Sequence, residues 1–144
     1  MIGLLDVNVL VALAWPNHVH HRPAREWFDT NRPNGWATCS TTQSSFVRVS
    51  SNHRILPEAK SPLAAWTILK EMVAEPSHEF WIDDLSIVST EYFDPRRLQG
   101  PRQVTDAHLL ALAQRHKGRL VTFDRGIRDL LSTDRNECLL LLGS

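Results

Sequence analysis

Short apolar runs alternate along this chain with longer segments in which apolar residues recur every three or four positions. Runs of the first kind predict strands at residues 2–6, 36–39, 79–82, 120–123 and 138–142. Segments of the second kind predict helices from Asn8 to before Pro16, at about 23–31, at 41–52, from Pro62 to before Pro76, and around Asp106. This alternation is typical of an α/β fold with a mainly parallel sheet.

A long segment without clean periodicity, residues 83–104, separates the third strand from the helix around Asp106. It contains Pro95, Gly100 and Pro101, and we interpret it as a long crossover. Loops of this length in compact domains are often functional, and this one leads directly to Asp106. We expect Thr105 to cap the following helix, which would place Asp106 on its first turn.

Composition narrows the class of protein. A chain of 144 residues that is 42% apolar and 22% charged has the size of one domain, residues 1–144, with a substantial core. Cys39 and Cys138 lie in apolar stretches without the spacing of a disulfide framework or metal site, and we interpret them as reduced core thiols. With no membrane-length apolar run and no leader-like start, we expect a cytoplasmic protein without a membrane partner.

Three aspartates adjoin apolar runs at matching junctions. Asp6 and Asp124 come at the carboxyl ends of two predicted strands, and Asp106 precedes the apolar face of a predicted helix. Ligands of open parallel sheets bind beyond the carboxyl ends of the strands. The sequence therefore predicts that Asp6, Asp106 and Asp124 converge at one rim of the sheet.

A cluster of three carboxylates requires a cation. Two carboxylates about 5 Å apart repel by roughly 3 kcal/mol at an effective dielectric near 20. Because Mg²⁺ and Mn²⁺ prefer hard oxygen ligands, an aspartate set without His or Cys indicates Mg²⁺, with Mn²⁺ as the second choice. Such ions activate water and stabilise charge on a phosphoryl group. We therefore predict that the three aspartates are catalytic metal ligands.

Each aspartate taken singly also has a simpler interpretation. Asp6 would cap the helix that follows it, Asp106 would complement a helix dipole, and Asp124 would begin a turn. It is their joint placement at one edge of one sheet that favours the metal site.

The charge distribution suggests a partner that carries phosphate. Formal net charge is zero, yet residues 96–128 hold eight basic and two acidic side chains. A basic surface beside the aspartates would favour a phosphodiester substrate, and we predict that Arg96, Arg97 and Arg102 contact it. A solvated basic face would account for the same charge distribution.

Three motifs in this order resemble the acidic motifs of the PIN-domain ribonucleases, in particular the VapC-type toxins of bacterial toxin–antitoxin pairs. They are Leu-Leu-Asp-Val-Asn at 4–8, Gln-Val-Thr-Asp-Ala at 103–107 and Thr-Phe-Asp-Arg at 122–125. The resemblance spans nearly the whole chain, and the three motifs together are specific. It implies a single PIN-like α/β domain whose mainly parallel central sheet is flanked by helices.

The resemblance also implies a function. Such proteins are Mg²⁺-dependent endoribonucleases that cleave structured RNA such as tRNA or ribosomal RNA, are neutralised by a VapB-type antitoxin and usually form homodimers. Asp6, Asp106 and Asp124 match the metal-binding acids of the family, Asn8 matches a polar residue that supports the first acid, and Thr122 matches a hydroxyl position near the fourth.

One position departs from the family pattern. Where the family often has a glutamate, on the helix after the second strand, this chain has Gln43, and no Asp or Glu occurs between Cys39 and Pro57. Gln43 offers a carbonyl oxygen but no charge, so a second metal ion would lack a charged ligand. The alternative function is therefore a catalytically weak PIN-like module that binds RNA or protein.

Other motifs carry less weight. A phosphatase with an aspartyl nucleophile would need an acid two residues after Asp6, where this chain has Asn8. The run His18-Val19-His20-His21 has no nearby Cys or acid partners, so we interpret it as the polar start of the next helix rather than a zinc site.

Overall fold

The computed structural model describes residues 1–88, 91–132 and 137–143 and confirms the α/β prediction. Its strands and helices, in chain order, are β1 (Gly3–Leu5), α1 (Val7–Ala14), α2 (His21–Asn31), η1 (Arg32–Asn34), β2 (Trp36–Cys39), α3 (Ser40–Ser50), α4 (Pro62–Val73), β3 (His78–Trp81), η2 (Pro95–Arg97), α5 (Arg102–Arg115), β4 (Arg119–Thr122), η3 (Arg125–Leu130) and β5 (Leu139–Leu141).

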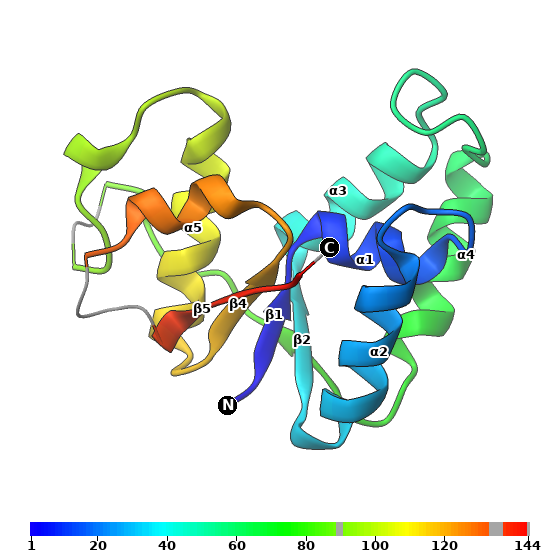
Figure 1. Ribbon diagram of the computed structural model, residues 1–144, viewed down its shortest axis with the longest axis horizontal. Helices are drawn as coiled ribbons and strands as arrows, with labels where there is room; N and C mark the ends of the chain where they lie inside the picture. The colour runs from blue at the N-terminus through cyan, green and yellow to red at the C-terminus, as the bar shows by residue number, and fades with distance from the viewer. Residues whose placement is uncertain (89–90, 133–136, 144) are drawn as a thin grey trace.

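All five strands run parallel, in the order β3-β2-β1-β4-β5 (Figure 1). The central strand β1 is buried along its whole length, as expected for a strand covered on both faces. Its first residue, Gly3, pairs with Trp36 of β2 and with Arg119 of β4. The carboxyl ends of β1 and β4 therefore lie next to each other at one edge of the sheet.

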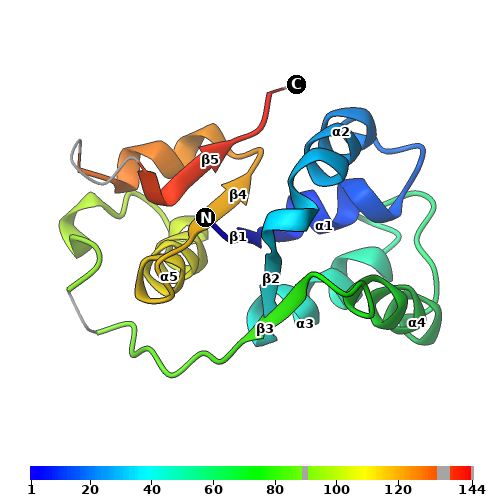
Figure 2. The same ribbon diagram turned by 90° about the horizontal axis from the view of Figure 1, so that it is seen from below.

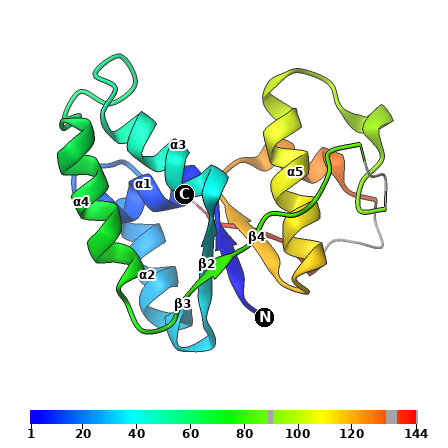
Figure 3. The ribbon, with the colours of Figure 1, turned by 180° about the vertical axis from the view of Figure 1, so that it is seen from behind.

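Helices cover both faces of the sheet (Figures 2 and 3). Helices α1 to α4 form one layer, whose core includes Leu10, Phe28 and Phe46 packed with Leu5 and Val121 of the sheet. Helix α5, η3 and part of the crossover form the other, whose buried residues include Phe93, Leu109, Leu112, Ile127, Leu4 and Leu120. Successive residues of β1, Leu4 and Leu5, thus point into opposite layers.

Helix α5 begins earlier than the sequence predicts. Its first residue is Arg102, so the prediction that Thr105 caps it is wrong, and Asp106 lies on the second turn. Pro101 already has helical dihedral angles, φ −63° and ψ −27°, and the Gln103 side chain accepts a hydrogen bond from the Gln99 backbone at 2.8 Å. The helical backbone of Pro101 and the hydrogen bond to Gln103 both favour an earlier start of the helix. The amino end of α5 therefore extends beyond the segment with apolar spacing.

Two side-chain contacts hold the crossover against α5. Asp83 contacts His108, and Asp84 contacts Arg115 at 2.8 Å. Asp83 also accepts a hydrogen bond from the backbone of Leu85, two residues further on, as expected of an aspartate at a local bend. The start of the long crossover is therefore fixed to the helix that carries Asp106.

Both cysteines are buried thiols outside any disulfide, as predicted. In the part of the chain that the structure describes, no helix is long and apolar enough to cross a membrane.

The turn before β4 has no room for a side chain at Gly118. A Cβ atom there would lie 2.5 Å from the backbone oxygen of Ile2 and 2.6 Å from the Trp81 ring. We expect Gly118→Ala to lower the free energy of unfolding by about 1 to 3 kcal/mol, because the backbone at Ile2, directly before β1, must shift. Gly100→Ala is the matched control, since its Cβ would meet nothing within 4 Å. Equal urea midpoints for the two variants would contradict this account.

Candidate carboxylate site

A cavity of about 590 Å³ at the carboxyl edge of the sheet brings together the three predicted aspartates. Asp6 follows β1, Asp124 follows β4, and Asp106 lies near the amino end of α5, which Figure 1 shows at the same edge. The other described lining residues are Val7, Asn8, Val11, His18, Val49, Ile55, Leu56 and Arg102. The cavity thus has an acidic side, an apolar wall and one guanidinium group.

Asp6 is buried and held in position from two sides. It caps α1, where one carboxylate oxygen accepts a hydrogen bond from the Val7 backbone at 2.8 Å, and the other accepts one from the Thr122 hydroxyl at 2.8 Å. Burial raises the pKa of Asp6, and the charge of Asp124 adds to the rise, while both hydrogen bonds lower it. The capping role and the place in the cavity therefore coexist in one residue.

Thr122 joins the ends of β1 and β4. Its buried hydroxyl donates to Asp6 and accepts hydrogen bonds from the Asn8 amide at 3.1 Å and the Asp124 backbone at 3.1 Å. The Asn8 carbonyl oxygen in turn accepts from the Phe123 backbone at 3.2 Å. These contacts use the full hydrogen-bonding capacity of the hydroxyl, so Thr122 positions Asp6 and has no lone pair left for a metal ion.

Asp106 is also under electrostatic strain. Burial, followed by the charges of Asp6 and Asp124, raises its pKa to about 7. Within the part of the chain that the structure describes, no backbone or side-chain donor forms a hydrogen bond with its carboxyl group. A half-buried carboxylate without a donor and beside two like charges is a suitable position for a cation.

Asp124 lies at the exposed rim of the cavity. One of its oxygens accepts a hydrogen bond from the Gly126 backbone at 2.9 Å and caps η3. The turn interpretation of Asp124 is therefore correct, and the residue faces the cavity as well.

The chemistry of this donor set fits a hydrated divalent cation. Among residues 1–88, 91–132 and 137–143, no three Asp, Glu, His or Cys side chains are gathered tightly enough to hold an ion directly. Mg²⁺ usually retains several waters and binds through one or two carboxylates, so it does not require such tight spacing. The three carboxylates repel one another and offer only oxygen atoms as ligands. Such a set is suited to Mg²⁺.

The predicted arginines separate in the structure. Arg102 lines the cavity, whereas Arg96 pairs with Asp94 at 2.9 Å and Arg97 donates to the Leu131 carbonyl at 3.2 Å. Neither Arg96 nor Arg97 is among the described lining residues. Of the three, Arg102 is the one positioned to meet a phosphate beside the carboxylates.

Gln43 also lies apart from the described lining. Its amide donates to the Thr38 hydroxyl at 3.0 Å, and that hydroxyl contacts His78 at 2.7 Å. The side chain thus links α3 to the sheet.

Sequence analysis missed the apolar wall and His18. Val49, Ile55 and Leu56 come from the end of α3 and the loop after it, where the sequence shows no motif. His18 was visible as part of a histidine run, but only the fold brings it to the aspartates.

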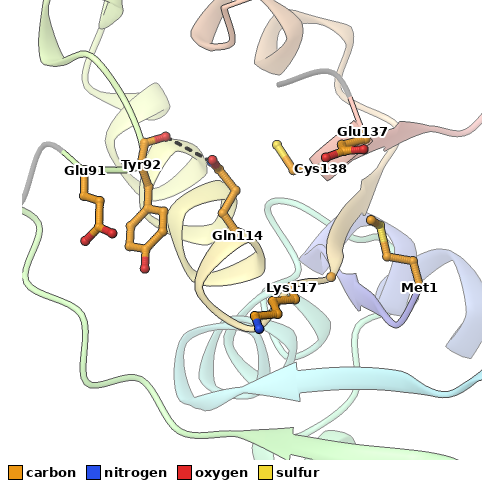
Figure 4. Close-up of a pocket in the computed structure, with 8 residues that line it drawn as sticks. Met1, Glu91, Tyr92, Gln114, Lys117, Glu137 and Cys138 are labelled. Carbon is orange, nitrogen blue, oxygen red and sulfur yellow. Dashed lines mark hydrogen bonds between the residues drawn. The ribbon is translucent and has the colours of Figure 1, made fainter. Parts of the chain in front are cut away.

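A second cavity, of about 440 Å³, lies at the opposite edge, where β1, β4 and β5 begin (Figure 4). Its lining includes Tyr92, Gln114, Lys117, Glu137 and Cys138, and the Gln114 amide donates to the Tyr92 carbonyl at 3.0 Å. Parallel sheets bind ligands at their carboxyl edge, so the carboxylate cavity remains the candidate site.

Comparison with known proteins agrees with this geometry. The family model of the PIN domain matches residues 3–130. Ribonuclease VapC39 of Mycobacterium tuberculosis (strain ATCC 25618 / H37Rv) is 45% identical over 139 residues, which are 96% of this chain and 100% of that protein. Ribonuclease VapC38 of the same strain is 51% identical over 126 residues, 88% of this chain and 87% of that protein.

The fold recurs in a solved structure of low sequence identity. The crystal structure of VapBC2 from Rickettsia felis, bound to a DNA fragment from their promoter, includes a chain that superposes with a TM-score of 0.63. It is 12% identical in sequence, and the match covers 99% of this chain and 100% of that one. At this identity the likeness shows the fold alone. Together, the match to the PIN domain and the identity to the two mycobacterial proteins show that this chain belongs to the PIN-domain family, among its VapC-type members.

Proposed function

We propose that this protein is a toxin of a toxin–antitoxin pair that acts as a metal-dependent endoribonuclease. The observation that carries the proposal is the convergence of Asp6, Asp106 and Asp124 on one cavity at the carboxyl edge of the sheet. Membership of the VapC-type group supports it, since the relatives are named ribonucleases. An enzyme of this kind would act on RNA in the cytoplasm.

The three carboxylates would hold Mg²⁺, or Mn²⁺ in its place. When bound, the ion supplies an activated water and stabilises charge on the phosphoryl group. The chain's own residues prepare the site: Thr122 and the Val7 backbone fix the Asp6 carboxylate before substrate arrives. With a pKa of about 7, Asp106 would be deprotonated when it serves as a ligand of that ion.

Arg102 would contact the RNA backbone. It is exposed at the amino end of α5 and lines the cavity that contains the carboxylates. A guanidinium at this position offers a fork of donors to phosphate oxygens. We propose structured RNA, tRNA or ribosomal RNA, as the substrate.

The proposed partner is a VapB-type antitoxin, and the proposed assembly is a homodimer. In the absence of metal, the repulsion among the three carboxylates is relieved by any cation that enters the cavity. An arginine or lysine of the antitoxin would supply that charge and block the metal and the phosphate together.

One observation favours a second function, a PIN-like module that binds RNA or protein and cleaves weakly. Gln43 stands where the family often has a glutamate, and its side chain is bound to Thr38. The site then has three carboxylates rather than four, which reduces the charge available to a second ion.

Substitution of Asp106 tests the main proposal. In Mg²⁺, we expect Asp106→Asn to abolish cleavage of bacterial RNA, because a neutral amide is a poor ligand for Mg²⁺. Asp129→Asn is the matched control, since Asp129 is exposed and is not among the described lining residues. Gel analysis of the RNA measures the result. Wild-type cleavage by Asp106→Asn would rule out the metal site, and no cleavage by the wild-type protein would favour the binding module.

The same variant should be more stable than the wild type without metal. Since the folded-state pKa of Asp106, about 7, lies above the ordinary value of 3.8, the folded protein binds this proton more tightly than the unfolded chain does. The carboxyl group therefore removes stability as pH rises from about 4 to 7.

Asp106→Asn should consequently gain about 1 to 2 kcal/mol at pH 8 with chelator present, allowing for solvent screening at a half-exposed group, and little at pH 4. Urea unfolding at the two pH values measures the difference. A variant that is less stable than the wild type at pH 8 would show that Asp106 has a structural role.

Substitution of Thr122 tests whether its hydroxyl positions Asp6. Thr122→Val keeps the shape but removes the hydrogen-bond partner of one Asp6 oxygen, of the Asn8 amide N–H and of the Asp124 backbone N–H. We expect a loss of about 1 to 3 kcal/mol in the free energy of unfolding and weaker Mn²⁺ binding by calorimetry. Thr122→Ser, which retains the hydroxyl, should bind Mn²⁺ as the wild type does. Equal Mn²⁺ affinity in the valine variant would contradict the positioning role.

A further inference from the structure

The histidine run separates into two roles in the structure. His21 is the first residue of α2, and its ring contacts the Ala12 carbonyl at 2.8 Å, in agreement with a polar start of that helix. His18 instead lines the carboxylate cavity, together with the three aspartates and Arg102. Its place beside these groups is not explained by helix formation.

A backbone contact fixes the orientation and the tautomer of the His18 ring. The backbone N–H of His20 donates to Nδ1 of His18 at 3.0 Å. A ring nitrogen that accepts a hydrogen bond carries no proton, so neutral His18 must carry its proton on Nε2. The ring therefore offers a donor, and not a base, at its second nitrogen.

The surroundings favour the neutral form of this ring. Burial lowers the pKa of His18, the neighbouring His20 and His21 lower it further, and Glu58 opposes them. The loop itself is held in place, because the His20 ring stacks on Phe123 with the ring centres 4.5 Å apart. Phe123 directly precedes Asp124, which lies at the rim of the cavity. The loop that carries His18 is therefore held, through His20, against the segment that carries Asp124.

A neutral donor has an advantage at this position. A charged imidazolium would pair with the aspartates in the free protein and compete with the metal ion for them. A neutral N–H forms weaker contacts with the carboxylates, yet it can still donate to an incoming anionic oxygen. Among the described residues that line the cavity, His18 and Arg102 both offer N–H donors to such an oxygen, one from a neutral ring and one from a charged group.

We propose that His18 binds the RNA substrate, donating Nε2–H to a phosphate oxygen of the backbone beside the carboxylates. This inference rests on the proposed ribonuclease function and adds a substrate contact to it. A neutral donor releases no counterion when it meets a phosphate, whereas an arginine does. The two contacts therefore differ in how salt affects them.

The experiment measures binding of labelled bacterial tRNA across a series of KCl concentrations. Ca²⁺ replaces Mg²⁺, so that the carboxylates are neutralised by a hard cation. The variants are His18→Ala, His18→Gln, Arg102→Ala and the control His53→Ala, whose side chain is exposed and is not among the described lining residues. Thermal melts of each variant identify any loss of folding.

We expect His18→Ala to weaken binding by about 5- to 30-fold at every salt concentration, with an unchanged slope of log affinity against log salt. Arg102→Ala should instead reduce that slope by about 1. His18→Gln, which places an amide N–H near the position of Nε2, should restore most of the affinity. His53→Ala should behave as the wild type does.

Three results would overturn the inference alone. They are wild-type affinity in His18→Ala, a reduced salt slope in His18→Ala, and a folded His18→Gln as weak as the alanine variant. In each case Arg102→Ala still reports whether the cavity binds RNA, and Mg²⁺-dependent cleavage by the wild type still reports on the proposed function. A wild-type protein that neither binds nor cleaves RNA would remove both proposals.

Discussion

The hydrogen bond from Thr122 to Asp6 is the contact on which the candidate site depends. It joins residues 116 positions apart in the sequence, at the ends of two adjacent parallel strands. Both partners are buried, so either one alone would be left with an unsatisfied polar group. The same hydroxyl accepts from Asn8 and from the Asp124 backbone, which sets the position of a second carboxylate. The acidic side of the cavity is therefore built outward from one threonine.

The sequence predicted the parts of the site that rest on strand periodicity. Asp6 and Asp124 were predictable because each directly follows an apolar run, and parallel strands bring their carboxyl ends together. The start of α5 was not predictable from the sequence, because it depends on the Gln103 side chain and on the backbone of Pro101 rather than on apolar spacing. Arg96 and Arg97 looked equivalent to Arg102 in charge, and only the fold separates them.

The site combines capping hydrogen bonds that stabilise the fold with carboxylate charges that oppose it. Asp6 and Asp124 cap α1 and η3, and each accepts backbone hydrogen bonds that compensate for its charge. For Asp106, burial and then the charges of Asp6 and Asp124 raise the pKa to about 7, and no hydrogen bond from the described residues opposes the rise. This division is characteristic of functional sites, where a strained group is retained because the surrounding structure holds it. The apolar packing of Leu109 and Leu112 on the same helix supplies that support.

The pairing of β1 with β4 has a consequence for protein synthesis. Strand β1 leaves the ribosome before its partner on one side, β4, which is translated only after α5. While β4 remains in the exit tunnel, Asp6 has no Thr122 beside it and Asp124 has not reached the cavity. The nascent chain therefore lacks the proposed nuclease site, and a cell that makes this protein is exposed to its activity only after β4 has been released and has inserted beside β1.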